Sequence, residues 1–204
     1  MQTIYDLQMN LNNRILQEKF GYTVQDMNEE QRKQWVLNFC RATNHEFWEL
    51  EESVLKEDEH NTVVEIVDLV HFLVSIGQVL DLKLDMRFNF YYHDGSKTFW
   101  LKNITETIHD CQKYLNDIEE CFGWRWWGTK TNDFIKASKI FYNLLWNFSI
   151  LISYLGVDEQ QLFEVYCQKN KINHERQDNG YNLDTKTEDD NKTIKIGGNL
   201  YRRR

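Results

Sequence analysis

Apolar residues recur every three or four positions along most of the chain, the spacing of one face of an α-helix. This pattern predicts six helices, over 3–20, 29–56, 61–81, 103–122, 131–156 and from about Asp158 to about His174. Asp158 and Gln161 have the spacing of a capping box at the start of the last helix. Proline is absent and glycine is scarce, so the usual turn residues of a β-rich protein are missing. The sequence therefore predicts an all-α bundle of about six helices.

Two segments depart from the helical pattern. Residues 84–101 carry aromatic residues on both sides of an Asp94-Gly95 pair, which predicts either a short hairpin excursion or an ordered loop. From residue 182 onward the chain is polar and charged, with little apolar surface to bury. We expect a mobile tail or an arm laid on a partner subunit. The chain thus divides into a domain at 1–181 and a polar C-terminal tail at 182–204.

The charge balance limits the class of partner. The 204 residues carry 24 basic and 32 acidic side chains, for a formal net charge of −8. A protein that grips the phosphate backbone of DNA or RNA needs a basic surface, so we expect no nucleic-acid partner. A free nucleotide remains compatible, because metal ions held by acidic side chains can carry its phosphates. The four cysteines lack CxxC spacing, so neither a zinc site nor a disulfide framework is indicated.

The sequence carries no pattern of export or membrane insertion. Its first ten residues lack a basic region followed by an apolar core, and no stretch reaches about 18 uncharged apolar residues. We therefore expect a cytoplasmic protein without a membrane segment, in the host cytoplasm if the source is viral. The absence of proline beside many Asn, Lys and Ile residues suggests an AT-rich genome, such as that of a phage.

Two pairs of acidic residues stand at i,i+3 spacing on neighbouring predicted helices. The first pair is Glu46 and Glu49, and the second is Glu65 and Asp68, followed by His71. The second pair interrupts the apolar stretch VVEIVDLVHFLVSIGQVL, where a carboxylate is costly to bury unless a cation or hydrogen bonds compensate it. If the pairs face each other, four carboxylates surround one space, which suits Mg²⁺ or Mn²⁺.

A simpler interpretation exists for each of these residues taken alone. Glu46 and Glu49 fit a solvated helix face, and His71 fits a core histidine that bonds a carbonyl group. The apolar surroundings of 65–68 leave that helix little solvent face, which favours the cation site. We interpret His71 as a contact to a sugar or base rather than as a metal ligand.

Basic and amide side chains share one face of the last predicted helix. Lys169, Asn173 and Arg176 recur at four and three residues, and Lys with Arg is the combination that phosphate oxygens require. Gly180 and Tyr181 follow at the helix end. The alternative is an ordinary basic patch that complements the dipole of a helix C-terminus.

Three motifs resemble the dimeric dUTPases, which belong to the all-α nucleoside triphosphate pyrophosphatases. The acid pairs have that family's arrangement, with fifteen residues between them. Residues 166–181, YCQKNKINHERQDNGY, are similar to the closing motif YxxKNxxNxxRQxxGY of dimeric dUTPases and of the T-even phage dCTPase-dUTPase. Residues 7–12, LQMNLN, resemble the LQxxLN segment that those enzymes use near the base. The three motifs follow one another from residue 7 to residue 181.

The resemblance implies an all-α homodimer that hydrolyses dUTP to dUMP and pyrophosphate, with dUDP as a further candidate substrate. Two or three Mg²⁺ ions, for which Mn²⁺ can substitute, are expected to bridge the phosphates, while a metal-activated water attacks the α-phosphorus. The implied metal ligands are Glu46, Glu49, Glu65 and Asp68. Glu49, or Glu46, is expected to orient or deprotonate the attacking water.

The same resemblance implies roles for the remaining site residues. Those expected to bind phosphate oxygens are Lys169, Arg176 and Tyr181. Those expected to contact the base and sugar are Gln8, Asn12, His71 and Asn173. Because an Asn or Gln amide can flip, dCTP is an alternative substrate, alone or beside dUTP.

The chain departs from the family pattern after the second glutamate. Dimeric dUTPases commonly carry a segment rich in Lys and Trp there, whereas residues 50–64 of this chain contain no tryptophan. A similar string, GWRWWG, stands at 123–128. The segment Trp124–Trp127 either replaces the missing lid across a dimer interface or anchors a loop as an aromatic cluster.

Two further functional classes compete with a dUTPase. A MazG-like pyrophosphatase of broad purpose would share the acid pairs, but Gln8, Asn12 and the closing motif weigh against it. A non-catalytic helical interaction protein would carry the acids as surface charge and the tryptophan-rich segment as a partner patch. Stabilisation by Mg²⁺ or Mn²⁺ separates the last class from the enzymes, because a solvated helix face gains little from either ion.

Overall fold

The computed structural model describes residues 3–84, 97–123, 127–128, 132–180 and 189–197, and these residues contain helices and no strand. The all-α class is therefore confirmed. The six α-helices are α1 (Ile4–Phe20), α2 (Glu29–Leu55), α3 (Glu59–Val79), α4 (Lys97–Glu120), α5 (Phe134–Leu155) and α6 (Glu159–Asp178). Two short 3₁₀ turns are also present, η1 (Val24–Asp26) and η3 (Asn191–Thr193).

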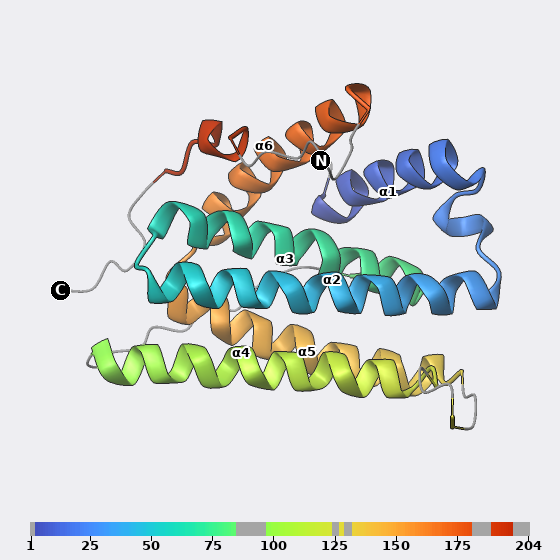
Figure 1. Ribbon diagram of the computed structural model, residues 1–204, viewed down its shortest axis with the longest axis horizontal. Coiled ribbons are helices and arrows are strands. Elements are labelled where there is room, and N and C mark those ends of the chain that lie inside the picture. The colour runs from blue at the N-terminus through green and yellow to red at the C-terminus, as the bar shows by residue number, and fades with distance from the viewer. Residues whose placement is uncertain (1–2, 85–96, 124–126, 129–131, 181–188, 198–204) are drawn as a thin grey trace.

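Helices α2 to α5 form a bundle, and α1 and α6 cover its upper side. Figure 1 shows α2 and α3 running antiparallel through the middle of the molecule, with α4 and α5 below them. Helix α2 packs on both α3 and α4, and α4 packs along α5. Helices α1 and α6 contact each other and both contact α3. Helix α3 therefore lies between two layers.

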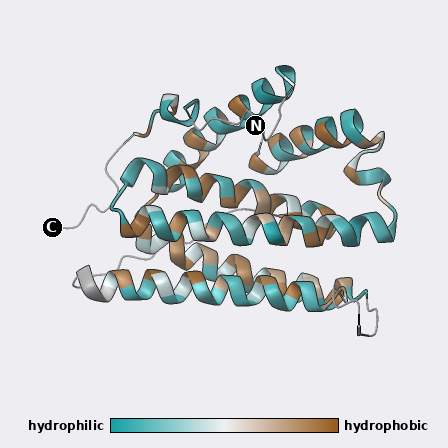
Figure 2. Ribbon diagram, in the orientation of Figure 1, coloured by the Kyte–Doolittle hydropathy of each residue, from teal (hydrophilic) through white to brown (hydrophobic). Residues whose placement is uncertain are grey.

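The central position of α3 explains its apolar sequence. Sixteen of its 21 residues are buried, and Figure 2 shows hydrophobic residues over most of its length. By length and composition α3 could cross a membrane, but 89% of that stretch is buried inside the protein, as in many core helices. Helices α5 and α6 pass the same test only as one pair, bent by 103°. Glu65, in the buried stretch of α3, therefore faces protein rather than bulk water.

Side-chain caps explain where five of the helices begin. Each cap oxygen accepts a hydrogen bond from a backbone N–H of the first helical turn, which otherwise lacks a partner. These cap residues are Thr3, Asn28, Asp58, Asp133 and Asp158. The predicted capping box of α6 forms only in part, because the Gln161 side chain donates to the Gly197 carbonyl instead. Gly21 and Gly156 end α1 and α5 in the left-handed conformation that glycine favours.

Two helix boundaries differ from the sequence prediction by four residues or more. Helix α4 begins at Lys97, so residues 97–101 are helical and do not belong to a hairpin. The Asp94-Gly95 pair lies outside the described residues. Helix α6 continues to Asp178, beyond its predicted end near His174; Glu175 and Asp178 are exposed, whereas Arg176 and Gln177 line the pocket described below.

Residues 189–197 of the predicted tail, for which a mobile tail or an arm on a partner subunit was expected, pack on their own chain. Ile194 is buried in the core, and its carbonyl accepts a hydrogen bond from His60. The backbone N–H and C=O of Lys195 both bond to the amide of Gln168 on α6. Two apolar side chains, Ile194 and Ile196, and several backbone bonds therefore hold this segment on its own chain. The division of the chain at residue 181 stays a prediction.

Candidate active site

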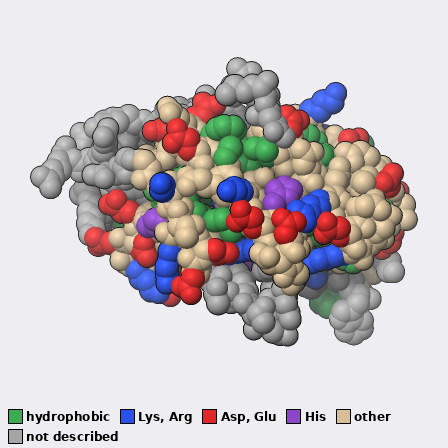
Figure 3. Space-filling view, turned by 90° about the horizontal axis from the view of Figure 1, so that it is seen from above, with side chains coloured by type: hydrophobic (Ala, Val, Ile, Leu, Met, Phe, Trp, Pro, Cys, Tyr) green, Lys and Arg blue, Asp and Glu red, His purple; other side chains and the backbone are tan. Residues whose placement is uncertain are grey.

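A pocket of about 470 Å³ opens where α1, α2, α3 and α6 meet. Figure 3 views the molecule from this side, where acidic, basic and histidine side chains gather in one band. Ten of the eleven side chains predicted from the sequence line the pocket. They are Gln8, Asn12, Glu46, Glu49, Glu65, Asp68, His71, Lys169, Asn173 and Arg176. The eleventh, Tyr181, lies outside the described residues.

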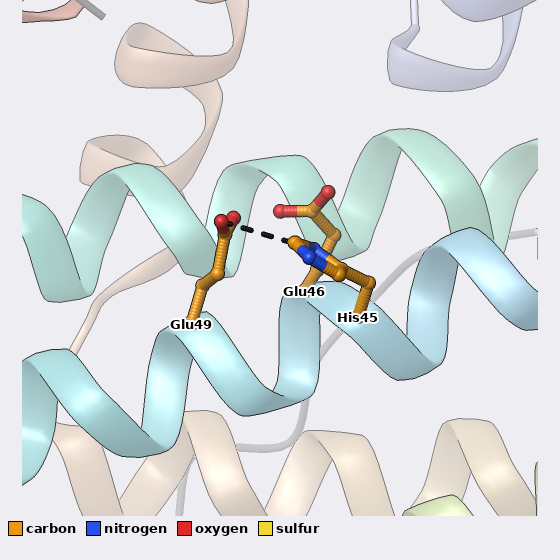
Figure 4. A group of neighbouring side chains, drawn as sticks. All are labelled: His45, Glu46 and Glu49. Atoms are coloured by element: carbon orange, nitrogen blue, oxygen red, sulfur yellow. Dashed lines mark ion pairs between the residues drawn. The ribbon is translucent and has the colours of Figure 1, made fainter.

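The acid pairs meet because α2 and α3 pack side by side. Glu46, Glu65 and Asp68 offer carboxylate oxygens that all lie within 4.8 Å of one another. Glu49 continues the row along α2 and forms a second group with Glu46 and His45 (Figure 4). The Nδ1 atom of His45 lies 3.7 Å from a carboxylate oxygen of Glu49. Spacing of three residues on each helix thus brings four carboxylates together.

Two of the grouped acids, Glu46 and Glu65, resist ionisation. Burial, followed by the charges of Asp68 and Glu49, raises the pKa of Glu46 to about 9. Burial, again followed by Asp68 and Glu49, raises the pKa of Glu65 to about 8, although Lys169 opposes this shift. Negative charge is therefore in excess at this end of the pocket.

The acid cluster has the chemistry of a divalent-cation site. All of its ligand atoms are carboxylate oxygens, which hard cations such as Mg²⁺ prefer. The buried Oε2 atom of Glu65 has no hydrogen-bond partner within the described part of the chain. Such an atom carries a desolvation cost that a bound cation offsets. Glu46, Glu65 and Asp68 could hold one ion, and Glu49 could share another.

Two cations face the acid cluster from α6. Lys169 is buried, and its Nζ atom donates to Asp68 at 2.7 Å and to the side-chain carbonyl of Asn191 at 2.9 Å. Arg176 donates through Nε and Nη2 to the carboxylate of Asp190, at 2.8 and 2.6 Å. Lys169 and Arg176 therefore lie at the pocket, as predicted, but they also bind residues of the C-terminal segment.

Asp190 and Asn191 are site neighbours that the sequence prediction missed. Both stand in a stretch that reads as a polar tail, and their partners on α6 lie 14 to 22 positions earlier in the chain. The available signal was the apolar alternation of Ile194 and Ile196 just after them. That pattern marks a stretch that can bury one face.

The far end of the pocket is polar but buried. Gln8 and Asn12 extend from α1, and the Gln8 amide donates to the Asn12 carbonyl oxygen at 3.0 Å. His71 from α3 stacks on Tyr166 from α6, with ring centroids 4.3 Å apart. Burial, followed by the nearby charge of Lys169, lowers the pKa of His71 to about 3, so the ring is neutral near pH 7.

Aromatic side chains complete the pocket wall beside this polar end. Phe39 from α2 and Phe72 from α3 both line the pocket, with ring centroids 6.3 Å apart. Trp35 packs against Phe39 at 5.4 Å between centroids and also lines the pocket. A flat heterocycle finds apolar ring faces here. Trp124–Trp126 lie outside the described residues, so the lid interpretation of that segment stays a prediction.

A comparison with protein families decides the class of this chain. A family model described as dUTPase matches residues 1–181. The chain belongs to the all-α dUTPase family. No curated protein and no solved structure matches it.

Membership of the dUTPase family identifies a nucleotide-hydrolysing enzyme with a nucleotide as its substrate. The match covers all six α-helices and therefore every wall of the pocket that they form. It ends before Asp190 and Asn191, which contact Arg176 and Lys169. Asp190 and Asn191 thus contact the pocket from outside the residues that match the dUTPase family.

Proposed function

We propose that this enzyme hydrolyses dUTP to dUMP and pyrophosphate with Mg²⁺ as its cofactor. The observation that carries the proposal is the meeting of four carboxylates with Lys169 and Arg176 in one pocket of a dUTPase-family chain. Carboxylates opposite cations suit a triphosphate whose charge is shared between metal ions and basic side chains. The aromatic and amide groups beyond them suit a pyrimidine nucleoside.

The acidic residues divide into two roles in this proposal. Glu46, Glu49, Glu65 and Asp68 hold two or three Mg²⁺ ions. When bound, Mg²⁺ neutralises phosphate charge and makes water easier to deprotonate. Glu49 is half-exposed beside His45, so it can orient a water and accept its proton as the α-phosphorus is attacked. Glu46 is the second candidate for that base.

The basic residues bind the phosphate oxygens. Lys has three N–H donors and Arg has five, so Lys169 and Arg176 can keep contacts to Asp68 or Asp190 and still donate to a phosphate. Tyr181 is expected to join them, by resemblance to the closing motif. At the other end of the pocket, Gln8, Asn12, His71 and Asn173 surround the base and sugar.

Pyrophosphate release from dUTP, dCTP, dTTP and UTP tests the proposal, each assayed with Mg²⁺ and with a chelator. We expect turnover of dUTP that requires Mg²⁺ and exceeds that of the other three nucleotides. Equal turnover of dCTP would indicate a dual enzyme of the phage type, and an assay with dUDP tests the diphosphate. Absence of turnover with all of them would contradict the proposal and favour a binding protein.

Site variants connect the activity to the pocket. Glu49→Gln should lower kcat by about a hundredfold or more, since it removes the proposed proton acceptor. Glu30→Gln is the matched control, because Glu30 lies on the same helix, is exposed and does not line the pocket. The double change Glu65→Gln with Asp68→Asn should abolish the rise in Tm that Mg²⁺ produces. A double variant that keeps the full rise would contradict the proposed cation site.

A further inference from the structure

Six buried or largely buried polar side chains form one hydrogen-bonded chain at the nucleoside end of the pocket. They come from three helices, α1, α3 and α6, and they are Gln8, Asn12, His71, Ser75, Gln78 and Tyr166. Each amide has a donor end and an acceptor end, so the direction of every bond constrains the next. Backbone carbonyls fix that direction at two places.

The first fixed point is the backbone carbonyl of Tyr5. A carbonyl oxygen only accepts, so the Gln78 atom 2.9 Å from it is the donor Nε2. The Oε1 atom of Gln78 therefore faces Asn12, whose Nδ2 atom donates to it at 2.8 Å. The Oδ1 atom of Asn12 is left facing Gln8 and accepts from its Nε2 atom at 3.0 Å.

The second fixed point is the backbone carbonyl of His71. The Ser75 hydroxyl donates its one proton to that carbonyl at 2.8 Å, so its oxygen can only accept from other groups. The amide nitrogens of Gln8 and Asn12 donate to it, at 3.2 and 2.8 Å. Both fixed points therefore give the Gln8 amide the same direction.

This direction determines the protonation pattern of His71. The Oε1 atom of Gln8 accepts from the Tyr166 hydroxyl at 2.6 Å and bonds to the Nδ1 atom of His71. Because this oxygen can only accept, Nδ1 must carry the ring proton. The Nε2 atom of the neutral ring then bears a lone pair. It is buried without a hydrogen-bond partner within the described residues, and the ring lines the pocket.

The same network holds the Gln8 amide in one orientation, so this amide cannot flip to suit either uracil or cytosine. Its Oε1 atom already accepts two hydrogen bonds and its Nε2 atom already donates two, which uses the full capacity of the amide. A flip would place donors against donors at His71 and Tyr166, and acceptors against acceptors at Asn12 and Ser75. The unsatisfied group that this network leaves beside the pocket is the Nε2 acceptor of His71.

We infer that the network fixes His71 as a hydrogen-bond acceptor, and that its Nε2 atom accepts from a neutral donor of the bound nucleoside. A sugar hydroxyl and the imino N–H of uracil share this chemistry. Ser75, Gln78 and Tyr166 act as positioning residues, because they set the ring tautomer through Gln8. The identity of the ligand rests on the proposed function, whereas the tautomer does not.

The tautomer is measured directly by ¹⁵N NMR of the His71 ring in the nucleotide-free protein near pH 7. We expect a protonated Nδ1 and a bare Nε2 in the unmodified chain, and a protonated Nε2 would overturn the inference. Gln8→Leu removes the fixed acceptor, so its ring should take up a mixture of both tautomers. Gln17→Leu is the matched control, since Gln17 is exposed on the same helix and should leave the spectrum unchanged.

Kinetics with substrate analogues identifies the donor. In the unmodified enzyme, kcat/KM for dUTP should fall about tenfold or more when the interacting donor is missing, mostly through KM. Loss with the 3′-deoxy analogue indicates the sugar hydroxyl, and loss with N3-methyl-dUTP indicates the imino group. Gln8→Leu should lower kcat/KM for dUTP by a similar factor. It should not lower kcat/KM any further for the analogue that lacks the interacting donor. If the variant lowers kcat/KM by the same factor for dUTP, the 3′-deoxy analogue and N3-methyl-dUTP, the acceptor role is wrong. Absence of any turnover by the unmodified enzyme would reject the proposed function, while the NMR result would still decide the tautomer.

Discussion

At the scale of single residues, the acids of α3 were predictable and their partners only in part. Glu65 and Asp68 stand out because they interrupt an apolar stretch, and the structure places Glu65 among the buried residues. Lys169 was predicted at the pocket from its helical spacing, but not its bond to Asp68. A sequence pattern gives the face of a helix, whereas the partner depends on how two helices pack.

The raised pKa values of Glu46 and Glu65 make the metal-free protein sensitive to pH. Their folded-state pKa values, about 9 and about 8, lie above the ordinary value of 4.5. Between the ordinary pKa of 4.5 and the raised values, these two groups bind more protons in the folded state than in the unfolded state. Their contribution to the free energy of unfolding therefore falls as pH rises. The lowered pKa of His71 opposes this trend below about pH 6.5, so we expect Tm in the presence of chelator to decrease from pH 7 to pH 9.

Two controls belong to this pH prediction. Glu65→Gln removes one of the two titrating groups, so its Tm should depend less on pH. Mg²⁺ should raise Tm most at the alkaline end, where the carboxylates lose their protons. A Tm that stays constant across this range in chelator would contradict the raised pKa values.

At the scale of elements, the C-terminal segment 189–197 binds two residues of the pocket wall, Lys169 and Arg176. Asn191 is buried, and its side-chain oxygen accepts from Lys169 at 2.9 Å and from Arg176 at 3.4 Å. Sequence reasoning located the six helices because their apolar periods and caps are local signals. It missed this segment because the alternation of Ile194 and Ile196 is too short to stand out in a polar stretch, and side-chain bonds to α6 leave no local signal.

Replacement of Asn191 tests the contribution of this segment. Asn191→Ala removes an acceptor from the buried Lys169 ammonium, so the free energy of unfolding should fall by about 1–3 kcal/mol. Urea denaturation followed by far-UV circular dichroism measures the change. Lys192→Ala in the same 3₁₀ turn is the control, because Lys192 is exposed, and its effect should stay within about 0.5 kcal/mol. Equal effects of the two substitutions would show that Asn191 is not a structural anchor.

A ring contact between α2 and α5 allows the effects of burial to be compared at two adjacent residues, Phe47 and Trp48. Phe47 is fully buried and meets Phe148 edge to face at 6.3 Å between ring centroids, whereas Trp48 is 65% exposed. Phe47→Ala should destabilise the protein by about 3–5 kcal/mol, because it leaves a cavity in the core. Trp48→Ala should change the free energy of unfolding far less. Chemical denaturation of both variants checks the order, and a larger loss for Trp48→Ala would contradict the burial.

At the scale of the whole molecule, the homodimer implied by the family resemblance stays a prediction. Helix α5 carries three exposed apolar residues, Ile135, Tyr142 and Trp146, at seven- and four-residue spacing. Residues with this spacing share one face of a helix. We expect this face of α5 to lie in the subunit interface.

Sedimentation velocity tests the predicted interface. The unmodified protein should sediment as a dimer, and Tyr142→Glu combined with Trp146→Glu should shift it toward monomer. Lys136→Glu is the control, since it adds acidic charge at an exposed position of α5 that lies about 100° around the helix from Ile135. A monomeric unmodified protein, or a double variant that remains fully dimeric, would contradict this interface.

Helix α3 contributes to both ends of the pocket, with Glu65 and Asp68 at the acidic end and His71 at the polar end. An α-helix advances 1.5 Å and turns about 100° per residue, so the stretch from Glu65 to Gln78 spans about 20 Å in one rigid rod. Under the proposed function, the helix therefore fixes the distance between the phosphate-binding end and the nucleoside-binding end of the pocket. A single residue inserted between Asp68 and His71 would leave every pocket residue in the chain. It would nevertheless rotate the acidic end of α3 by about 100° relative to the polar end.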